Sequence, residues 1–443
     1  MECEASTDVQ ELQAQIDKVC KDIEFQKQAL RNLERSKSVL QRQLNTLRDP
    51  IARLPVEVSS EIFLQCLPPR PELGVHRVPM LFLHVCNTWT DIALSDPALW
   101  ATMYIDPKLC TDGFEQASER WLQRAGVQPL HLSTIATIDA RIADLLWRYS
   151  SRLESLELAG LSYKDMLSDR PYGSFDCGPL LGGAPPVSLP LLHTLSMTGS
   201  SSLEFSLSSI LQLLSLAPNL VNVVFRDVMI GLDVDESTPV TVLPSVRCLG
   251  VEDNNQYRGT NQHRLLGYVA TPRLDALIVY QPDVYKMLDM YSLFIQRSSP
   301  PLRKLIIRNC SDAFKSLNKY ISLVSSTLTH LDIPSASSIC LKLLESLAQP
   351  SADLLPLLEV LKLGRVYPDD WDRDGSSELW DVVLRVLAVR RVRMRIFRMT
   401  FALNVPEIPS AVMIAFKDVM ASGMDIWIES TWQEKDRNVN VLA

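Results

Sequence analysis

The chain has 443 residues, of which 47% are hydrophobic and 22% are charged, an ordinary composition for a folded protein with a sizeable core. Its formal net charge of -8 argues against nucleic acid or an anionic membrane as the main partner, because those partners need clustered Lys and Arg. A neutral or basic protein partner fits better.

The pattern of cysteines, histidines and apolar runs points to no site for chemistry. The nine cysteines are scattered without a C-x-x-C pair, and the six histidines fall in no metal-ligand spacing. We therefore predict reduced thiols and no catalytic, cofactor-binding or metal-binding residues. The amino terminus is acidic and polar, and no run of about 18 apolar residues occurs, so we expect a cytoplasmic or nuclear protein with no membrane partner.

A seven-residue apolar repeat runs through residues 9–47. Its two interleaved series, interrupted only by Lys37 and Gln26, hold Val9, Ile16, Ile23, Leu30 and Leu44, and Leu12, Val19, Leu33, Leu40 and Leu47. With Thr7 or Asp8 as N-cap and Pro50 as a stop, residues 1–49 are interpreted as one coiled-coil helix. The helix that covers this seam can belong to a second copy, to another protein, or to this chain folded back.

Residues 50–105 are expected to form three short helices with a wide apolar arc. Pro55 suits the first helical position, and the first helix carries Val58, Ile62 and Cys66 on one face and Ser59, Phe63 and Leu67 on the next. A second helix is expected over 81–93, and Ser95 or Asp96 with Pro97 starts a third. Three short helices cannot bury this apolar arc among themselves, and we therefore expect part of it to form an interface. The alternative is a helical subdomain packed on the rest of the chain.

The motifs of this region resemble a known domain, the F-box, in the F-box-like form common in mushroom-forming fungi. The matching residues, over about 48–104, are Leu54-Pro55, Glu57, Glu61-Ile62-Phe63, Leu67, Val85-Cys86, Trp89, Ile92-Ala93 and Pro97-Ala98-Leu99-Trp100. The resemblance implies a module that docks on a Skp-type adaptor, and through it on a cullin-RING ubiquitin ligase. The adaptor-binding residues that it implies are Leu54, Pro55, Ile62, Phe63, Leu67, Val85, Cys86 and Trp89.

One departure from the family pattern concerns charge. The family usually carries Arg or Lys beside the Val-Cys and Trp positions, where this chain has Asn87, Thr88 and Thr90. We expect weaker electrostatic steering toward an acidic adaptor.

Residues 106–443 repeat a phrase of the form Pro-x-(Leu/Val)-x-x-(Leu/Val)-x-apolar. After Leu153, its first apolar positions are Leu192, Leu220, Val246, Leu274, Leu302, Leu328 and Leu358. From Leu192 onward the spacing is 26 to 30 residues, typical of helix-bearing leucine-rich repeats. Helical patterns lie between the phrases, at 210–217, 290–297, 313–324, 339–347 and 379–389. The predicted fold is therefore α/β: a curved leucine-rich-repeat-like solenoid with a parallel sheet and outer helices.

One residue of each predicted strand is expected to point to the concave surface. In chain order these are Ser196, Val224, Gly250, Ile278, Ile306, Asp332 and Lys362. The predicted target-binding residues are Val224, Ile278, Tyr280 and Ile306, rimmed by Arg226, Lys304 and Arg308. Another segment covering this patch is an equally weighted alternative.

Taken with the F-box resemblance, these patterns predict a non-enzymatic substrate-recognition subunit of a Skp-cullin-F-box ubiquitin ligase. Its partners would be the adaptor and cullin complex, an unknown target protein, and a helix bound through residues 9–47. The alternative is a scaffold protein in which the F-box-like helices only cap the solenoid.

Overall fold

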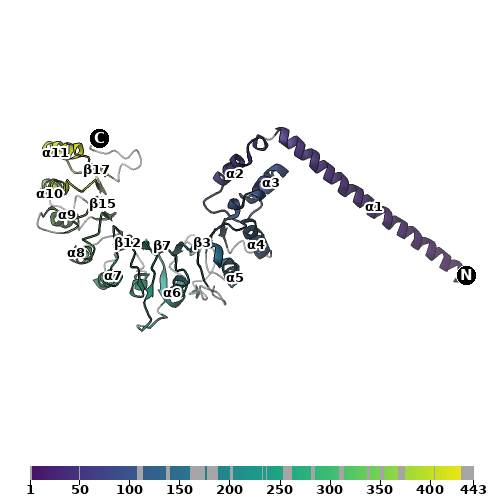
Figure 1. Ribbon diagram of the computed structural model, residues 1–443, viewed down its shortest axis with the longest axis horizontal. Helices are drawn as coiled ribbons and strands as arrows, with labels where there is room; N and C mark the ends of the chain where they lie inside the picture. Colours follow the sequence, from purple (N-terminus) through teal and green to yellow (C-terminus); the bar gives the residue numbers. More distant parts are fainter. Residues whose placement is uncertain are drawn as a thin grey trace. The chain divides into compact units, whose positions relative to one another are not determined.

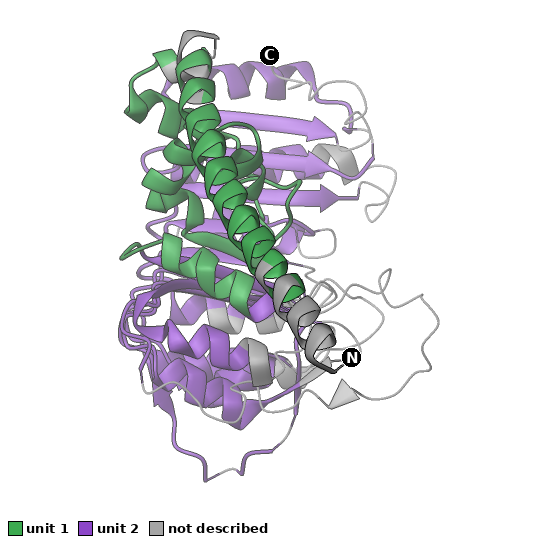
Figure 2. Cartoon of the chain, turned by 90° about the vertical axis from the view of Figure 1, so that its right-hand side faces the viewer, with its two compact units in different colours: residues 1–104, 116–128 green, residues 105–115, 129–443 purple. Residues whose placement is uncertain are grey.

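The computed structural model divides the chain into two compact units (Figure 2). Unit 1 comprises residues 1–104 and 116–128, and unit 2 comprises residues 105–115 and 129–443. The structure describes residues 2–48, 50–106, 113–135, 140–159, 175–176, 188–199, 203–231, 233–235, 237–252, 262–280, 285–308, 314–336, 340–349, 354–367, 375–403 and 405–430.

Unit 1 opens with one long helix, α1 (Glu2–Arg48) (Figure 1). The single helix is confirmed, and it ends just before Pro50, which cannot continue it. The predicted N-cap at Thr7 or Asp8 is wrong, because the helix already begins at Glu2. Residues 2–6 contain no Pro or Gly, so nothing in the sequence stops the helix from extending in that direction.

Five short helical segments follow, and we call residues 51–100 the helical module. They are η1 (Ile51–Arg53), α2 (Val56–Gln65), η2 (Met80–His84), α3 (Asn87–Ser95) and η3 (Pro97–Trp100). Pro55 is the N-cap of α2 and not its first helical residue. The single helix predicted over 81–93 is divided, because Cys86 is extended (φ -161°, ψ 169°). The third start is confirmed: the Asp96 side chain accepts a hydrogen bond from the Ala98 amide.

Strands between Thr102 and Ser430 form a large parallel sheet. It has 12 strands in the order β1-β2-β3-β5-β7-β10-β12-β13-β14-β15-β16-β17. Their bounds are β1 (Thr102–Ile105), β2 (Leu130–Ile135), β3 (Leu153–Ala159), β5 (Thr194–Thr198), β7 (Asn222–Arg226), β10 (Cys248–Glu252), β12 (Ala276–Tyr280), β13 (Lys304–Arg308), β14 (His330–Ile333), β15 (Val360–Val366), β16 (Ile396–Phe401) and β17 (Asp425–Ser430).

Two small sheets accompany this large sheet. One holds β4 (Phe175–Asp176), β6 (Leu203–Ser206) and β8 (Met229–Gly231), and the other holds β9 (Thr241–Val242) and β11 (Val269–Ala270).

Helices alternate with the strands of the large sheet and lie along one side of it (Figure 1). They are α5 (Ala140–Arg148), α6 (Leu207–Ser215), α7 (Tyr285–Ser298), α8 (Phe314–Leu323), α9 (Cys340–Ala348), α10 (Gly375–Arg390) and α11 (Ser410–Ala421). The five helices predicted between the repeated phrases correspond to α6 to α10, with shifted ends. The α/β class and the parallel sheet of the predicted solenoid are therefore present.

The repeated apolar anchors lie in the core between strands and helices. Each predicted position from Leu153 to Leu358 is at most 1% exposed and precedes or begins a strand of the large sheet. Two further anchors, Met394 and Met424, precede β16 and β17 and are also buried. The periodic Leu and Val residues thus hold the strands against the helices, and the repeat continues beyond the predicted series.

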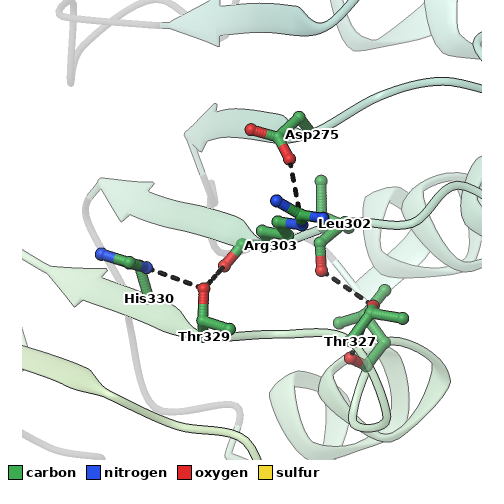
Figure 3. Close-up of polar contacts among 7 residues, drawn as sticks. Asp275, Leu302, Arg303, Thr327, Thr329 and His330 are labelled. Atoms are coloured by element: carbon green, nitrogen blue, oxygen red, sulfur yellow. Dashed lines mark hydrogen bonds and ion pairs between the residues drawn. The ribbon is translucent and has the colours of Figure 1, made fainter.

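Backbone hydrogen bonds tie each repeat to the next at the start of its strand. The Asp275 carbonyl accepts from the amides of both Arg303 and Lys304, and the Arg303 carbonyl accepts from those of Thr329 and His330, all at 2.9 Å. Side chains add to these bonds: the Thr329 hydroxyl donates to the Arg303 carbonyl at 3.1 Å, and Arg303 pairs with the Asp275 carboxylate at 3.7 Å (Figure 3). These contacts fix the register from strand to strand.

Among the described residues, no helix is long and apolar enough to cross a membrane.

Candidate functional site

The α2 helix separates its apolar residues into an inner and an outer face. Ser59 and Phe63 are buried, whereas Val58, Ile62 and Cys66 on the neighbouring face are exposed. The Ser59 hydroxyl is within hydrogen-bond distance of the carbonyls of Ile51 and Pro55, at 3.2 and 3.3 Å, which ties α2 to the segment before it. The structure therefore leaves part of the apolar arc outside the core of the module, as the sequence predicted.

An aromatic cluster supports this outer face from within. The Phe63 ring stacks on Phe82 with centroids 4.2 Å apart, and Trp89 lies 5.0 Å from Phe63 and 5.8 Å from Phe82. Phe63 is only 1% exposed. Its side chain is thus part of the core of the module and is not offered to a partner, unlike that of its neighbour Ile62.

The other residues implied by the resemblance differ in exposure. Leu54, Pro55, Ile62 and Val85 are exposed, whereas Leu67, Cys86 and Trp89 are half-buried. Leu54, Ile62 and Val85 show 39%, 37% and 50% of their surface. Sequence reasoning did not include Val56 and Leu81 in this set, although both are also exposed. Their position in the sequence, beside the matching motifs, could have indicated that they belong to this exposed face.

A second cluster fixes the end of the module. Trp100 and Trp121 are both fully buried and pack edge to face with centroids 5.2 Å apart, and the Trp121 indole donates to the Trp100 carbonyl at 3.0 Å. Trp121 belongs to α4 (Phe114–Arg124). The Arg124 guanidinium lies 4.5 Å from the Trp100 ring, and burial, with a smaller contribution from Arg120, lowers its pKa. This cluster is structural.

We call the face of the large sheet opposite the helix-covered core the open face. It carries one continuous row of residues. Strand register joins these residues pair by pair, and we call them the middle row: Ser133, Glu157, Ser196, Val224, Gly250, Ile278, Ile306, Asp332, Lys362, Arg398 and Trp427. All seven residues predicted for the concave surface are in this row. Residues on either side of them in each strand, such as Leu277 and Val279, are buried in the core.

Three of the four predicted target-binding residues, Val224, Ile278 and Ile306, fall in a single stretch of this row. Val224, Gly250, Ile278 and Ile306 are consecutive neighbours, and the three apolar side chains among them are half-buried. Tyr280 pairs with Arg308 in the next row, and its side chain lies outside the described residues. The structure therefore brings the predicted aliphatic residues together on one face.

A buried glutamate borders the apolar stretch. Glu252 is 2% exposed, and its carboxylate lies 3.6 Å from Arg226 Nε and 3.3 Å from Arg308 Nε. Arg226 lies on the adjacent strand β7, whereas Arg308 reaches across β12 from β13. Both arginines remain about half exposed, so Glu252 holds two guanidinium groups at the edge of the apolar stretch. Sequence reasoning named the two arginines and missed Glu252.

Cations surround the next part of the middle row. Burial raises the pKa of Asp332, while Lys362, Lys304, Arg308 and Arg398 act in the opposite direction. Arg398 is held by the buried carboxylate of Glu429, whose Oε1 also accepts from Thr400 at 2.9 Å. The open face therefore passes from an apolar stretch to a region where four basic side chains act on one carboxylate.

The structure also adds Arg398 and Trp427 to the middle row. Trp427 is 43% exposed, which makes it a large apolar side chain available on the open face. The sequence prediction ended at Lys362 because the last two repeats use Met394 and Met424 as anchors, where the phrase called for Leu or Val. Alternation of apolar residues in 394–399 was the signal that could have extended it.

Within the described part of the chain, no three His, Cys, Asp or Glu side chains are grouped so that they could hold a metal ion. The chain matches no protein-family model, and a comparison with curated proteins also found no match.

Proposed function

We propose that this chain is a non-enzymatic substrate receptor of a Skp-cullin-F-box type ubiquitin ligase. The helical module binds the adaptor, and the open face of the sheet binds the target protein. The ligase gains proximity between the target and a ubiquitin-conjugating enzyme, and no bond is made or broken on this chain.

The outer face of the helical module carries the adaptor half of the proposal. Leu54, Val58 and Ile62 are exposed beside a core that is already closed by the Phe63, Phe82 and Trp89 rings. Exposed apolar side chains on a rigid, well-packed helical support are typical of a protein-binding surface. Leu54 and Ile62 are also among the residues that match the F-box-like motifs.

The middle row supports the target half of the proposal and indicates the target's chemistry. On one face, an apolar stretch of Val224, Ile278 and Ile306 lies beside Lys304, which is in the same strand as Ile306, and Lys362 follows two strands beyond Ile306. Such a surface complements a segment that has apolar side chains beside acidic ones. We propose that the target presents this kind of segment.

Co-purification with a Skp-type adaptor tests the adaptor half. Leu54→Asp with Ile62→Asp is expected to abolish it, because a bound adaptor would desolvate two carboxylates without partners. The matched control is Val127→Asp with Val392→Asp, which adds the same charges at residues that are 93% and 96% exposed elsewhere. The control should bind as the natural chain does, and undiminished binding by the first variant would contradict the proposal.

A separate substitution tests the open face. Ile278→Asp is expected to remove the target from pull-downs while adaptor binding persists, because it replaces an apolar contact with a charge of the target's own sign. Ser196→Asp, in the same row but outside the apolar stretch, is the matched control and should retain the target. The measurement is quantitative mass spectrometry of the bound proteins, and equal target loss in both variants would argue against recognition by the apolar stretch.

A further inference from the structure

We propose that two copies of this chain pair through α1 as a parallel, in-register coiled coil. The pairing does not depend on the proposed ligase function. It follows from the exposure of the apolar seam of α1, from the polar residues that interrupt the seam, and from the charges that flank it.

The seam is exposed throughout its described length. In heptad notation, Ile16, Ile23, Leu30, Lys37 and Leu44 occupy a positions, and Leu12, Val19, Gln26, Leu33 and Leu40 occupy d positions. The apolar members are between 39% and 68% exposed. A helix of 47 residues spans about 70 Å, and such a length of exposed seam needs a partner helix for stability in water.

The contact of α1 with its own helical module uses a different face. The Asn87 side chain donates to the Ser38 hydroxyl at 3.4 Å, and Ser38 is a b position. Leu33 and Leu40, in the seam on either side of that contact, are 68% and 65% exposed. The module therefore leaves the seam open to a second helix.

The interruptions of the seam are self-complementary in a parallel pair. In register, Gln26 faces Gln26 of the second copy, and each carboxamide carries both donors and acceptors, so the two can bond each other. Lys37 faces Lys37 of the second copy. The long aliphatic part of each side chain packs in the seam, and each ammonium group reaches water. A single Lys at an a position restricts the assembly to two strands and fixes the register at a cost in stability.

The flanking residues also favour the parallel arrangement. Each g residue then lies beside the e residue five positions later in the second helix, and the described pairs are Gln15–Cys20, Asp22–Lys27, Ala29–Glu34 and Ser36–Gln41. Asp22 and Lys27 attract each other, and none of these pairs joins like charges. Ile16 and Ile23 at a positions with Leu33 and Leu40 at d positions are the combination that favours parallel dimers.

The first test is the mass of the full-length chain in solution by light scattering. The natural chain should have twice the mass of one chain, and Leu33→Asp with Leu40→Asp should halve it. The matched control is Phe25→Asp with Val39→Asp, which changes two c-position residues that are 72% and 53% exposed. The control should remain a dimer. A monomeric natural chain, or equal masses for the two variants, would overturn the proposal.

The second test determines orientation and register by disulfide cross-linking. In a Cys20→Ser background, Leu33→Cys at a d position should form a covalent dimer under mild oxidation, because the two thiols meet across a parallel seam. Arg35→Cys, at the outward f position two residues away, is the control and should cross-link no more than the background. An antiparallel pair that overlaps along the whole of α1 places residue 33 opposite residue 17, so the two introduced thiols would lie about 24 Å apart and could not form a disulfide. Equal cross-linking by both variants would therefore overturn the parallel arrangement.

Discussion

Replacing Phe63 with alanine is expected to lower the stability of the helical module by about 3–5 kcal/mol, the usual cost of truncating a buried Phe. The lost ring stacks on Phe82 and contacts Trp89, so its removal leaves a cavity where α2, η2 and α3 meet. Hydrogen exchange of the full-length chain, read by mass spectrometry, measures the change locally. The amides of α2 and α3 should exchange much faster, while those of the large sheet keep their protection.

Ile62→Ala is the matched control for Phe63→Ala. Ile62 is the next residue in the chain and is 37% exposed, so truncating it should cost about 1 kcal/mol and leave exchange in α2 nearly unchanged. Under the proposed function it should nevertheless weaken adaptor binding, because Ile62 lies on the outer face of the helical module. Unchanged exchange in Phe63→Ala would show that the aromatic cluster does not hold the module together.

Replacing Gly199 with alanine is expected to destabilise the repeats around β5 and β7 by about 3 kcal/mol, at the upper end of the usual cost of overpacking. The added Cβ would collide with the carbonyl oxygen of Asp227 and lie 2.7 Å from Val228 Cα. These are backbone atoms, and the Gly199 amide already donates to the Arg226 carbonyl at 2.7 Å. The two strand ends must therefore separate, which faster hydrogen exchange in β5 and β7 would reveal.

Gly250→Ala is a control for the same change of residue on the neighbouring strand β10. Its Cβ would meet side-chain atoms only, the two Val224 methyl groups at 3.2 and 3.4 Å and Glu252 Oε1 at 3.5 Å. Side chains can move by a few tenths of an ångström, so this variant should lose much less stability than Gly199→Ala. If the two variants lose equal stability, close backbone approach is not what requires glycine at residue 199.

The repeats were predictable because burial in this fold depends on a regular sequence pattern. Leu192, Leu220, Leu302 and their counterparts recur at nearly constant spacing, and each one closes the core between a strand and a helix. At Met394 and Met424 the anchor residue is Met instead of Leu or Val, so the repeated phrase could not be recognised there. The extent of the repeats was therefore harder to predict than their α/β class and parallel sheet.

Helix boundaries were less predictable than helices because they depend on single backbone conformations. Nothing in the residues near Cys86 excludes a continuous helix, and only the structure shows that Cys86 is extended. In the structure, the Thr90 hydroxyl lies 3.2 Å from the Leu83 carbonyl and 3.0 Å from that of Cys86, which stabilises the break. Such local side-chain bonds compete with helix continuation in a way that periodicity does not reveal.

For the candidate site, sequence reasoning found seven of the eleven residues of the middle row but not the side chains that hold the row in place. The row follows from strand alternation, so Val224, Ile278 and Ile306 could be placed on one face in advance. Glu252 could not be assigned, because an arginine from two strands away meets it only in the folded sheet. Likewise, Ile62 is exposed and Phe63 is buried because of the face of α2 that packs against Phe82 and Trp89, which the sequence alone does not reveal.

The carbonyl-to-amide bonds at the strand starts have an evolutionary consequence. These bonds join main-chain atoms, so they do not depend on the side chains at positions such as Ser196, Ile278 and Lys362. A substitution there changes the surface of the open face without altering the main-chain bonds between neighbouring repeats. Under the proposed function, the target-binding surface can therefore change step by step while the helical module stays the same.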